Sequence, residues 1–449
     1  MGKVLTKKSR LNAVQVLSIG FAIVVLIGAL ILTLPISSVS GESTNFIDAI
    51  FTSTSAVCVT GLVTLDTGTH WSTFGQVIII MLIEIGGMGF MSFTTFIAIL
   101  LGKKITLRDR LLMQEAMNTF NIEGLVRMVQ YVFALTFSVQ FFGALLLSTQ
   151  FIPQLGFSKG LFYSIFHSIS AFCNAGFDLF GNFNSLTGYS SNIVVILSIS
   201  ALIIIGGLGF TVWLEIYNYN KSSKRLSLNS KVVLLVTIFL IIFGFICIFL
   251  FEYKNIQTIG GMSFKDKILN SFFASVSPRT AGFNSISTDD MTMSGKLITI
   301  ILMFIGGSSG STAGGLKTAT FGVLILTVIS VLKGREDTEA FEKRFSKDLV
   351  YKAFTLFFIA MMLVMIVTMI LTIVEPNQSF INLLYEATSA FGTVGLTTGV
   401  TQQLSFTGKI VIMLTMYCGR VGPLTVILAL LNRKKKKGYR YPEGKILIG

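Results

Sequence analysis

Four short phrases of small residues carry the recurring pattern in this chain that is best suited to chemistry. They read SAVCVTGL (55–62), SAFCNAGF (170–177), VSPRTAGF (276–283) and SAFGTVGL (389–396). Their side chains share no acid, base or nucleophile, so the chemistry open to them is that of backbone carbonyl oxygens. A ring of such oxygens can replace the hydration shell of a dehydrated cation. The glycine in each phrase permits a positive φ at no steric cost, which helps the carbonyls to face a common axis.

The repetition extends beyond these eight residues. Aligned on their glycines, the phrases recur at intervals of 115, 106 and 113 residues, at Gly61, Gly176, Gly282 and Gly395. An aromatic residue lies ten positions before each glycine and a small residue five positions before it, namely Phe51, Phe166, Phe272 and Tyr385, and Ala56, Ala171, Ser277 and Ala390. One phrase alone would favour close helix packing. Four copies with fixed offsets favour a pore.

The composition shows which elements must position the phrases. Only 12% of the residues are charged, against about 25% in a soluble protein, and the mean hydropathy is +0.77. Since a transmembrane helix needs about 20 apolar residues, eight runs qualify, at 14–36, 71–101, 126–152, 192–217, 231–251, 296–332, 350–374 and 408–432. Shorter apolar segments, such as 45–57 and 379–391, lead into the phrases and are too short to cross a bilayer.

These features predict an all-α polytopic membrane protein with eight transmembrane helices. A transmembrane helix, a pore helix, a filter loop and a second transmembrane helix would occur four times around a central ion pore. Non-helical backbone at membrane depth is tolerated where protein buries it or water reaches it, as in a pore. The half-helices would direct their partly negative C-terminal ends toward a cation. The expected divisions are 1–102, 103–220, 221–340 and 341–432, followed by a basic tail at 433–449.

The second half of the third repeat contains an unusual segment, IGGSSGSTAGGLK at 305–317. Its glycines disfavour a continuous helix, since each costs up to about 1 kcal/mol, so a broken helix with an irregular loop facing the pore is predicted. The predicted gating loop comprises Gly306, Gly307, Ser308, Ser309, Gly310, Ser311, Thr312, Ala313, Gly314 and Gly315.

Arg420 is an intramembrane arginine, which is by default a functional hypothesis because its charge is costly in the bilayer. Free carbonyls of the 306–315 loop are its expected partners, and together they would bar the ion path. The alternatives are a structural ion pair or a side chain that extends to the membrane surface. Lys317 could either extend to the cytoplasmic side or position the loop, and the sequence leaves both interpretations open.

The distribution of basic residues predicts an orientation. Of 35 Lys and Arg residues, 26 lie in the segments 1–10, 103–127, 221–231, 333–352 and 433–445, and seven lie on the opposite side. The positive-inside rule then places both termini in the cytoplasm. The run RKKKK at 433–437 is interpreted as an anchor that contacts lipid headgroups. An RNA-binding tail is the weaker alternative, and no nucleic-acid partner is predicted.

Other classes of function fit less well. The four cysteines and two histidines have no zinc-site spacing, and no GxSxG, HExxH or Walker A motif occurs, so no enzyme and no cofactor are predicted. An ion-coupled secondary transporter is a second hypothesis. Such transporters usually show inverted repeats and midplane acids, whereas Asp48, Glu84 and Glu386 form no repeated site. A nonselective or mechanosensitive channel is a third.

The phrases CVTGL, CNAGF, RTAGF and TVGL, with the fourfold plan, resemble the superfamily of K+ transporters that contains Trk, Ktr and HKT proteins. The resemblance covers essentially the whole chain and is strongest to the bacterial Ktr membrane subunits, KtrB and KtrD. It implies a K+ selectivity filter, with K+ held at filter carbonyls only, and a gating role for the 306–315 loop and Arg420. The implied filter residues are Cys58, Val59, Thr60, Gly61, Cys173, Asn174, Ala175, Gly176, Arg279, Thr280, Ala281, Gly282, Gly392, Thr393, Val394 and Gly395.

The resemblance also implies partners that the chain does not contain. Ktr membrane subunits are homodimers on a cytosolic ring of the KtrA or KtrC type, whose RCK subunits bind ATP or ADP. A homodimer of this chain in the bacterial plasma membrane, with Na+ as a modulator of K+ transport, is therefore expected. The tail at 438–449 would contribute to the dimer contact.

Overall fold

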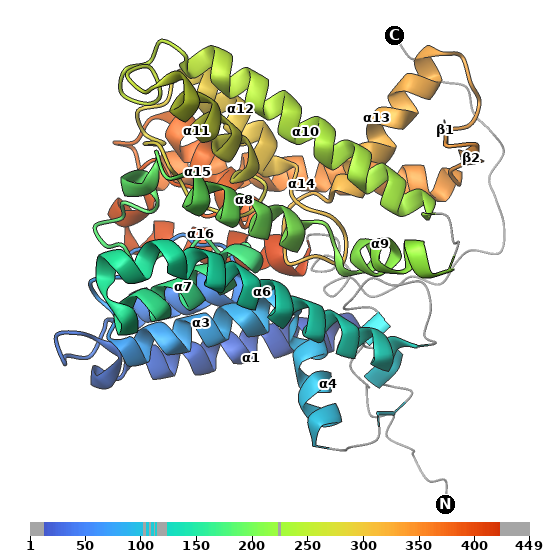
Figure 1. The fold of residues 1–449 in the computed structure, drawn as a ribbon. Helices are drawn as coiled ribbons and strands as arrows, with labels where there is room; N and C mark the ends of the chain where they lie inside the picture. Colours follow the sequence, from blue (N-terminus) through green and yellow to red (C-terminus); the bar gives the residue numbers. More distant parts are fainter. Residues whose placement is uncertain are drawn as a thin grey trace, which may run out of the picture.

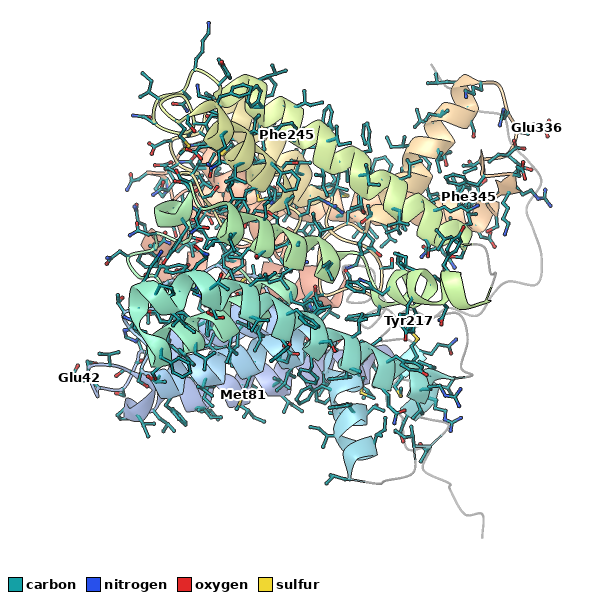
Figure 2. The ribbon with its side chains drawn as sticks, viewed as in Figure 1. Glu42, Met81, Tyr217, Phe245, Glu336 and Phe345 are labelled. Carbon is teal, nitrogen blue, oxygen red and sulfur yellow. The ribbon has the colours of Figure 1, made fainter. Side chains whose placement is uncertain are left out.

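Helices dominate the computed structural model, which describes residues 13–101, 105–106, 109–111, 113–114, 124–222 and 226–422 (Figure 1). The long helices are α1 (Ala13–Thr33), α6 (Leu125–Leu155), α10 (Leu228–Glu252) and α14 (Lys347–Val374). Among the described residues, these four are the helices that are each long and apolar enough to cross a membrane without a second, bent segment. Exposed apolar side chains, such as Met81, cover the outer faces of the bundle (Figure 2).

A short helix and then a second helix follow each long one. The short helices are α2 (Phe46–Cys58), α7 (Phe157–Phe172), α11 (Phe264–Val276) and α15 (Phe380–Gly392). The second helices are α3 (Thr73–Met88), α8 (Ile193–Gly207), α12 (Met293–Phe304) and α16 (Phe406–Val421). Each second helix begins at a polar N-cap whose side chain accepts a hydrogen bond from the backbone three residues on, at Ser72, Asn192, Thr292 and Ser405. Such caps satisfy a helix N–H group that would otherwise lack a partner.

The second helices of the first two units end in a sharp bend, where continuous spans over 71–101 and 192–217 were predicted. The chain turns by 98° between α3 and α4 (Phe90–Leu100), and by 98° between α8 and α9 (Phe210–Ser222). The break lies at Gly89 and Gly209, whose φ values are +81° and +92°. That conformation suits glycine and ends a right-handed helix. Counting each bent pair as one span gives up to six spans in the described chain.

The second helix of the third unit is interrupted rather than bent. Helix α12 ends at Phe304, and α13 (Thr318–Leu332) begins after a segment without helix. A small hairpin of β1 (Glu339–Ala340) and β2 (Lys343–Arg344) follows, with Glu339 opposite Arg344. The single-turn helices η1 (Pro35–Ser37), η2 (Thr187–Tyr189) and η3 (Thr401–Gln403) lie in loops. The basic tail at 433–449 and the end of the eighth predicted span, 423–432, lie outside the described residues.

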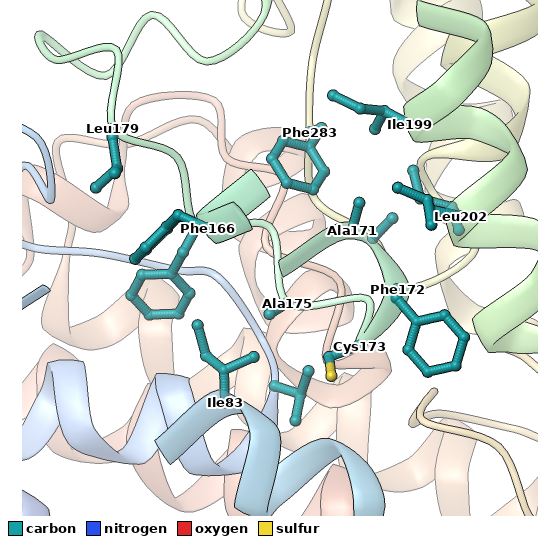
Figure 3. Packing of buried hydrophobic residues seen from close by; sticks show 14 of the residues in the cluster. Ile83, Phe166, Ala171, Phe172, Cys173, Ala175, Leu179, Ile199, Leu202 and Phe283 are labelled. Atoms are coloured by element: carbon teal, nitrogen blue, oxygen red, sulfur yellow. The ribbon is translucent and has the colours of Figure 1, made fainter. Parts of the chain in front are cut away.

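The main hydrophobic core surrounds the first three phrases, and smaller clusters pack around the fourth. Figure 3 shows Phe166, Ala171 and Ala175 of the second unit packed with Ile83 of α3 and Phe283 of the third phrase. These residues come from three different units and are all buried. The core therefore holds together the loops that follow the short helices of the first three units.

Candidate functional site

Every phrase contains two residues with positive φ, separated by one residue. The glycines Gly61, Gly176, Gly282 and Gly395 have φ between +69° and +95°. The residues two positions earlier, Val59, Asn174, Thr280 and Thr393, have φ between +50° and +77°. A positive φ is a genuine outlier for a β-branched residue and is maintained only where the surrounding structure imposes it. Alternation in the sign of φ turns successive carbonyl oxygens toward one side of the chain.

The four glycines form a closed ring. A Cβ atom added to Gly61 would lie within 3.0 Å of the carbonyl oxygen of Ala175, the residue before the next glycine. The same holds for Gly176 against Ala281, for Gly282 against Val394 and for Gly395 against Thr60. The contacts thus pass from each phrase to the next and return from the fourth to the first. Glycine is required at all four positions because the neighbouring backbone leaves no room for a side chain.

The other residues of the predicted filter are buried around this ring. Cys58, Val59, Thr60, Cys173, Asn174, Ala175, Thr280, Ala281, Thr393 and Val394 have at most 1% of their surface exposed, and Gly392 is buried too. Arg279 points away from the ring, since its Nη2 atom donates to Thr237 Oγ1 on α10 at 3.4 Å. The thiol of Cys173 donates to Glu84 at 3.3 Å behind the second phrase.

Serine residues that open the phrases brace them, a role that the sequence analysis missed. Ser55 Oγ accepts from Gly61 N at 3.0 Å, and Ser389 Oγ accepts from Gly395 N at 3.1 Å. Ser170 Oγ instead donates to Phe177 O at 2.7 Å. The serine at the start of three phrases was a signal that could have revealed this role. The braces at Ser55 and Ser389 hold their glycines at the ring, and the brace at Ser170 holds the residue after Gly176.

Glu386 is a second overlooked brace. It is fully buried and accepts from Thr398 N at 3.0 Å, from Thr401 Oγ1 at 2.6 Å and from Thr397 Oγ1. The carboxylate therefore ties the loop after the fourth phrase to α15. No periodic sequence signal could have found it, because the other three units lack an equivalent acid.

The predicted gating loop lies against the start of the phrases. Thr312 Oγ1 donates to Gly206 O at 3.2 Å and to Phe172 O at 3.4 Å, just before the second phrase's Cys173. A Cβ atom added to Gly314 would clash with the Thr393 side chain of the fourth phrase. Ser308 N donates to Gly207 O at 3.0 Å, which fixes the loop to α8. The loop thus packs against several units on one side of the ring.

Arg420 joins this loop to the first unit. Its Nη1 atom donates to the carbonyl oxygen of Thr312, one of the expected loop carbonyls. Its Nη2 atom donates to Gly86 O and, at 3.2 Å, to Gly87 O on α3. These α3 carbonyls were not predicted as partners. One partly buried guanidinium therefore connects α16, the loop and α3.

Lys317 lies at the end of the same loop. Its Nζ atom donates to Ala313 O at 2.6 Å, and the residue is the N-cap of α13. Of the two interpretations of Lys317, this geometry favours the one in which the ammonium group positions the loop. Lys317 is three residues after Gly314. Like Arg420, it is a basic residue that donates to a carbonyl oxygen of the loop.

A cavity of about 50 Å³ lies on the opposite side of the ring from the loop. The four glycines form part of its wall, as do Asp66, Asp178, Asn284, Thr397 and Gln402. Burial raises the pKa of Asp178 to about 7, the Phe180 N–H bond lowers it and the charge of Asp66 raises it. Elsewhere in the loops, burial lowers the pKa of His70, although the nearby Asp48 raises it. Within the described ranges, no group of three or more His, Cys, Asp or Glu side chains could hold a metal ion.

Comparison with known proteins gives consistent similarities. A family model described as TrkH, a cation transport protein, matches residues 10–437. The chain is 46% identical over 447 residues to the potassium/sodium uptake protein NtpJ of Enterococcus hirae, covering 98% of each. It is 41% identical over 440 residues to the Ktr system potassium uptake protein B of Bacillus subtilis, covering 98% of this chain and 97% of that one. The crystal structure of the potassium transporter TrkH from Vibrio parahaemolyticus has the same fold, with a TM-score of 0.74 at 18% identity over 96% of this chain and 87% of that chain.

Proposed function

Because this chain belongs to the TrkH family of cation transport proteins, we propose that it is the ion-conducting membrane subunit of a potassium uptake system. The predicted membership of the Trk and Ktr group is confirmed, and the protein is a multi-pass membrane cation transporter rather than an enzyme. The relatives are named for potassium or for potassium and sodium uptake. Those names support K+ as the ion that this chain transports.

The ring of four glycines carries this proposal. Each short helix ends within its phrase, so that its C-terminal end leads into the ring, and helix C-termini attract cations. The carbonyl oxygens of the sixteen predicted filter residues would replace the water around K+. In this proposal the four units are pseudo-repeats around one pore. Eight transmembrane helices result if the bent and interrupted segments each cross the membrane and α16 continues beyond Val421.

The 306–315 loop and Arg420 are the proposed gate. The loop lies against the inner side of the phrases, and Arg420 holds it to α3 through the bond to Thr312 O. A guanidinium in this position repels a cation, and the loop obstructs its path. Opening requires that Arg420 release the carbonyl of Thr312 and that the loop move away from α8.

The proposal extends to the assembly around the pore. A relative named as protein B of a Ktr system supports the existence of further components. We therefore expect a homodimer in a bacterial plasma membrane, with both termini cytoplasmic, on a nucleotide-binding ring of the KtrA or KtrC type. Na+ is expected to modulate transport, in line with the potassium/sodium relative. The tail at 438–449, the expected dimer contact, lies outside the described residues.

Ion flux through the purified protein in liposomes tests the proposal. Separate gradients of K+, Na+ and chloride should give K+ flux above Na+ flux and no chloride flux. Gly282→Ser should lower the K+/Na+ preference by about tenfold or more, because a side chain there clashes with Val394 O in the ring. Gly188→Ser is the matched control, since a Cβ atom there meets nothing within 4 Å. An unchanged preference in Gly282→Ser would contradict the filter.

A further inference from the structure

Helix α9 connects the proposed gating loop to the edge of the membrane. We propose that the exposed C-terminal part of α9 binds the headgroup layer of the cytoplasmic leaflet and thereby holds the 306–315 loop in its obstructing position. This inference rests on the proposed function, because the loop is the gate of that proposal. It adds a surface that binds lipid and a route by which the membrane acts on the gate.

The start of α9 is bonded to the gating loop. Phe210 N donates to Gly310 O at 2.8 Å. A Cβ atom added to Gly209, the residue before α9, would lie 2.7 Å from Ser308 Oγ and 2.8 Å from Ser309 O. The backbone at the start of α9 therefore contacts three consecutive residues of the loop. When the loop moves, either these contacts break or α9 moves with it.

Two further hydrogen bonds fix the direction of α9. Trp213 Nε1 donates to Ile205 O on α8 at 2.9 Å, across the 98° bend. Glu215 Oε2 accepts from Ser227 N at 2.9 Å, and Ser227 is the N-cap of α10. Helix α9 is thus connected to the loop, to α8 and to α10. A chain of such contacts can carry a displacement of the far end of α9 to the loop.

Helix α10 shows where the membrane lies. Exposed apolar side chains occur on it from Leu235 to Phe251 and are followed by the exposed Tyr253, a distance of about 27 Å along the helix. That length matches the hydrocarbon core of about 30 Å, and tyrosine is typical of its edge. Ser227 lies before Leu235 by about 12 Å of helix, which takes it beyond the hydrocarbon to the headgroup level. Glu215 bonds to Ser227 and is therefore at the same level.

The residues of α9 after Glu215 suit a headgroup layer. Ile216, Tyr217 and Tyr219 have 47%, 56% and 53% of their surface exposed. The Asn218 between the tyrosines is exposed as well. Hydrocarbon would take the amide of Asn218 away from water, which is costly, whereas water alone would surround three large apolar side chains. The boundary between lipid and water suits both, and tyrosine is enriched there.

A cytosolic protein is the other class of partner that this surface could bind. The observations favour lipid, because the surface lies at the headgroup level beside the lipid-facing side of α10. The segment 216–219 also contains no acidic or basic side chain that would recognise a charged protein surface. The headgroup layer is therefore the proposed partner, and a protein partner is an outcome that the experiment can reveal.

The depth of α9 is measured with a nitroxide label on the full-length protein in liposomes that contain no other protein. The label is attached to Tyr219→Cys after Cys247 and Cys418, which are not fully buried, have been replaced by alanine. Its collisions with oxygen and with a water-soluble nickel chelate should be intermediate between those of two reference labels. These are Ile242→Cys, on the lipid-facing side of α10, and Glu336→Cys, in the exposed loop after α13.

Two results would overturn the proposed surface. A label at position 219 that is as accessible to water as the label at position 336 would leave the surface to a protein partner. A label as deep as the one at position 242 would place the end of α9 in hydrocarbon rather than among headgroups.

K+ flux in the same liposomes tests the connection to the gate. The double variant Ile216→Ser and Tyr219→Ser should raise the flux about threefold, because a weaker anchor lets the loop move. Glu215→Ala should have a similar effect, since it removes the hydrogen bond to Ser227. Tyr219→Trp should keep the wild-type flux, because tryptophan suits the headgroup layer equally well. Tyr351→Ser, at a tyrosine of α14 that is 66% exposed, is the matched control and should change nothing.

Unchanged flux in the double serine variant or in Glu215→Ala would overturn the connection between the membrane surface and the loop. If the double variant fails to fold, Glu215→Ala and the depth of the label still decide. Failure of the wild type to transport K+ would instead refute the proposed function. The depth measurement needs no transport, so the two failures can be told apart.

Discussion

Helices α3 and α16 have the same plan but differ at both ends. Each begins at a serine N-cap that accepts from the N–H of Gly75 or Gly408. Near the other end, Gly86 packs against Val57 O, and Gly419 packs against Phe391 O. Val57 and Phe391 occupy the same place, immediately before the phrase residues Cys58 and Gly392. The two helices therefore contact their own short helices in the same way.

The differences fall one residue after each shared glycine. At one end α3 has Gln76, which donates to Thr67 O and Trp71 O within its own unit, whereas α16 has Lys409, which bonds to Asp48 on α2. At the other end α3 has Gly87, whereas α16 has Arg420, which bonds to α3. Helix α16 thus uses a basic side chain at both ends to reach the first unit. These bonds add to the apolar packing of α16 against α2 and to the hydrogen bond from Tyr417 to Ser18 O, which also join the fourth unit to the first.

The largest expected effect comes from making α16 like α3 at its C-terminal end. Arg420→Ala should raise K+ flux in liposomes by about tenfold or more, since charge-assisted hydrogen bonds contribute about 1.5–3 kcal/mol and 1.4 kcal/mol is a factor of ten. Arg420→Lys should give an intermediate flux, because one ammonium cannot reach both Thr312 O and Gly86 O in the same way. Unchanged flux in the alanine variant would remove the barrier role and leave a purely structural arginine.

The shared glycines predict an effect of equal size in both helices. Gly86→Ala and Gly419→Ala should each destabilise the protein by roughly 1–3 kcal/mol, because the added methyl group overlaps a backbone carbonyl that cannot move freely. Thermal unfolding of the detergent-solubilised protein measures the change. Gly188→Ala, with open space around it, should stay within about 0.5 kcal/mol of wild type. A large loss in one glycine variant only would show that the two helices pack differently.

A smaller effect is expected at the N-terminal end of α16. Lys409→Met should destabilise the protein by about 1–2 kcal/mol, because it leaves the mostly buried carboxylate of Asp48, 14% exposed, without its ion pair. Lys265→Met, at an exposed lysine without a described acidic partner, is the control. Adding Asp48→Asn to Lys409→Met should recover part of the loss, since two coupled changes are not additive. If the double variant loses as much as the sum of the single ones, the bond contributes nothing.

The helical class and the position of the four phrases could be predicted because both depend on local sequence. The short helix at 46–58 ends within the first phrase, as the apolar segment 45–57 indicated. The bends at Gly89 and Gly209 could not be predicted, because a single glycine costs a helix only up to about 1 kcal/mol and does not by itself end an apolar span. Gly209 turns where it meets Ser308 and Ser309 of the loop, which is a tertiary contact. The partner of Arg420 on α3 lies more than 300 residues away in sequence. A periodic sequence pattern cannot predict a contact between residues so far apart.

The junction between α16 and the first unit has a consequence for biogenesis. During synthesis the N-terminal units emerge and begin to fold first, whereas α16 is the last described helix to leave the ribosome. Until α16 arrives, Gly86 O lacks the Arg420 donor and Asp48 lacks its cation. The nascent protein therefore carries two unpaired polar groups in its first unit until α16 is inserted. A chain that ends before α16 would keep both groups without these partners.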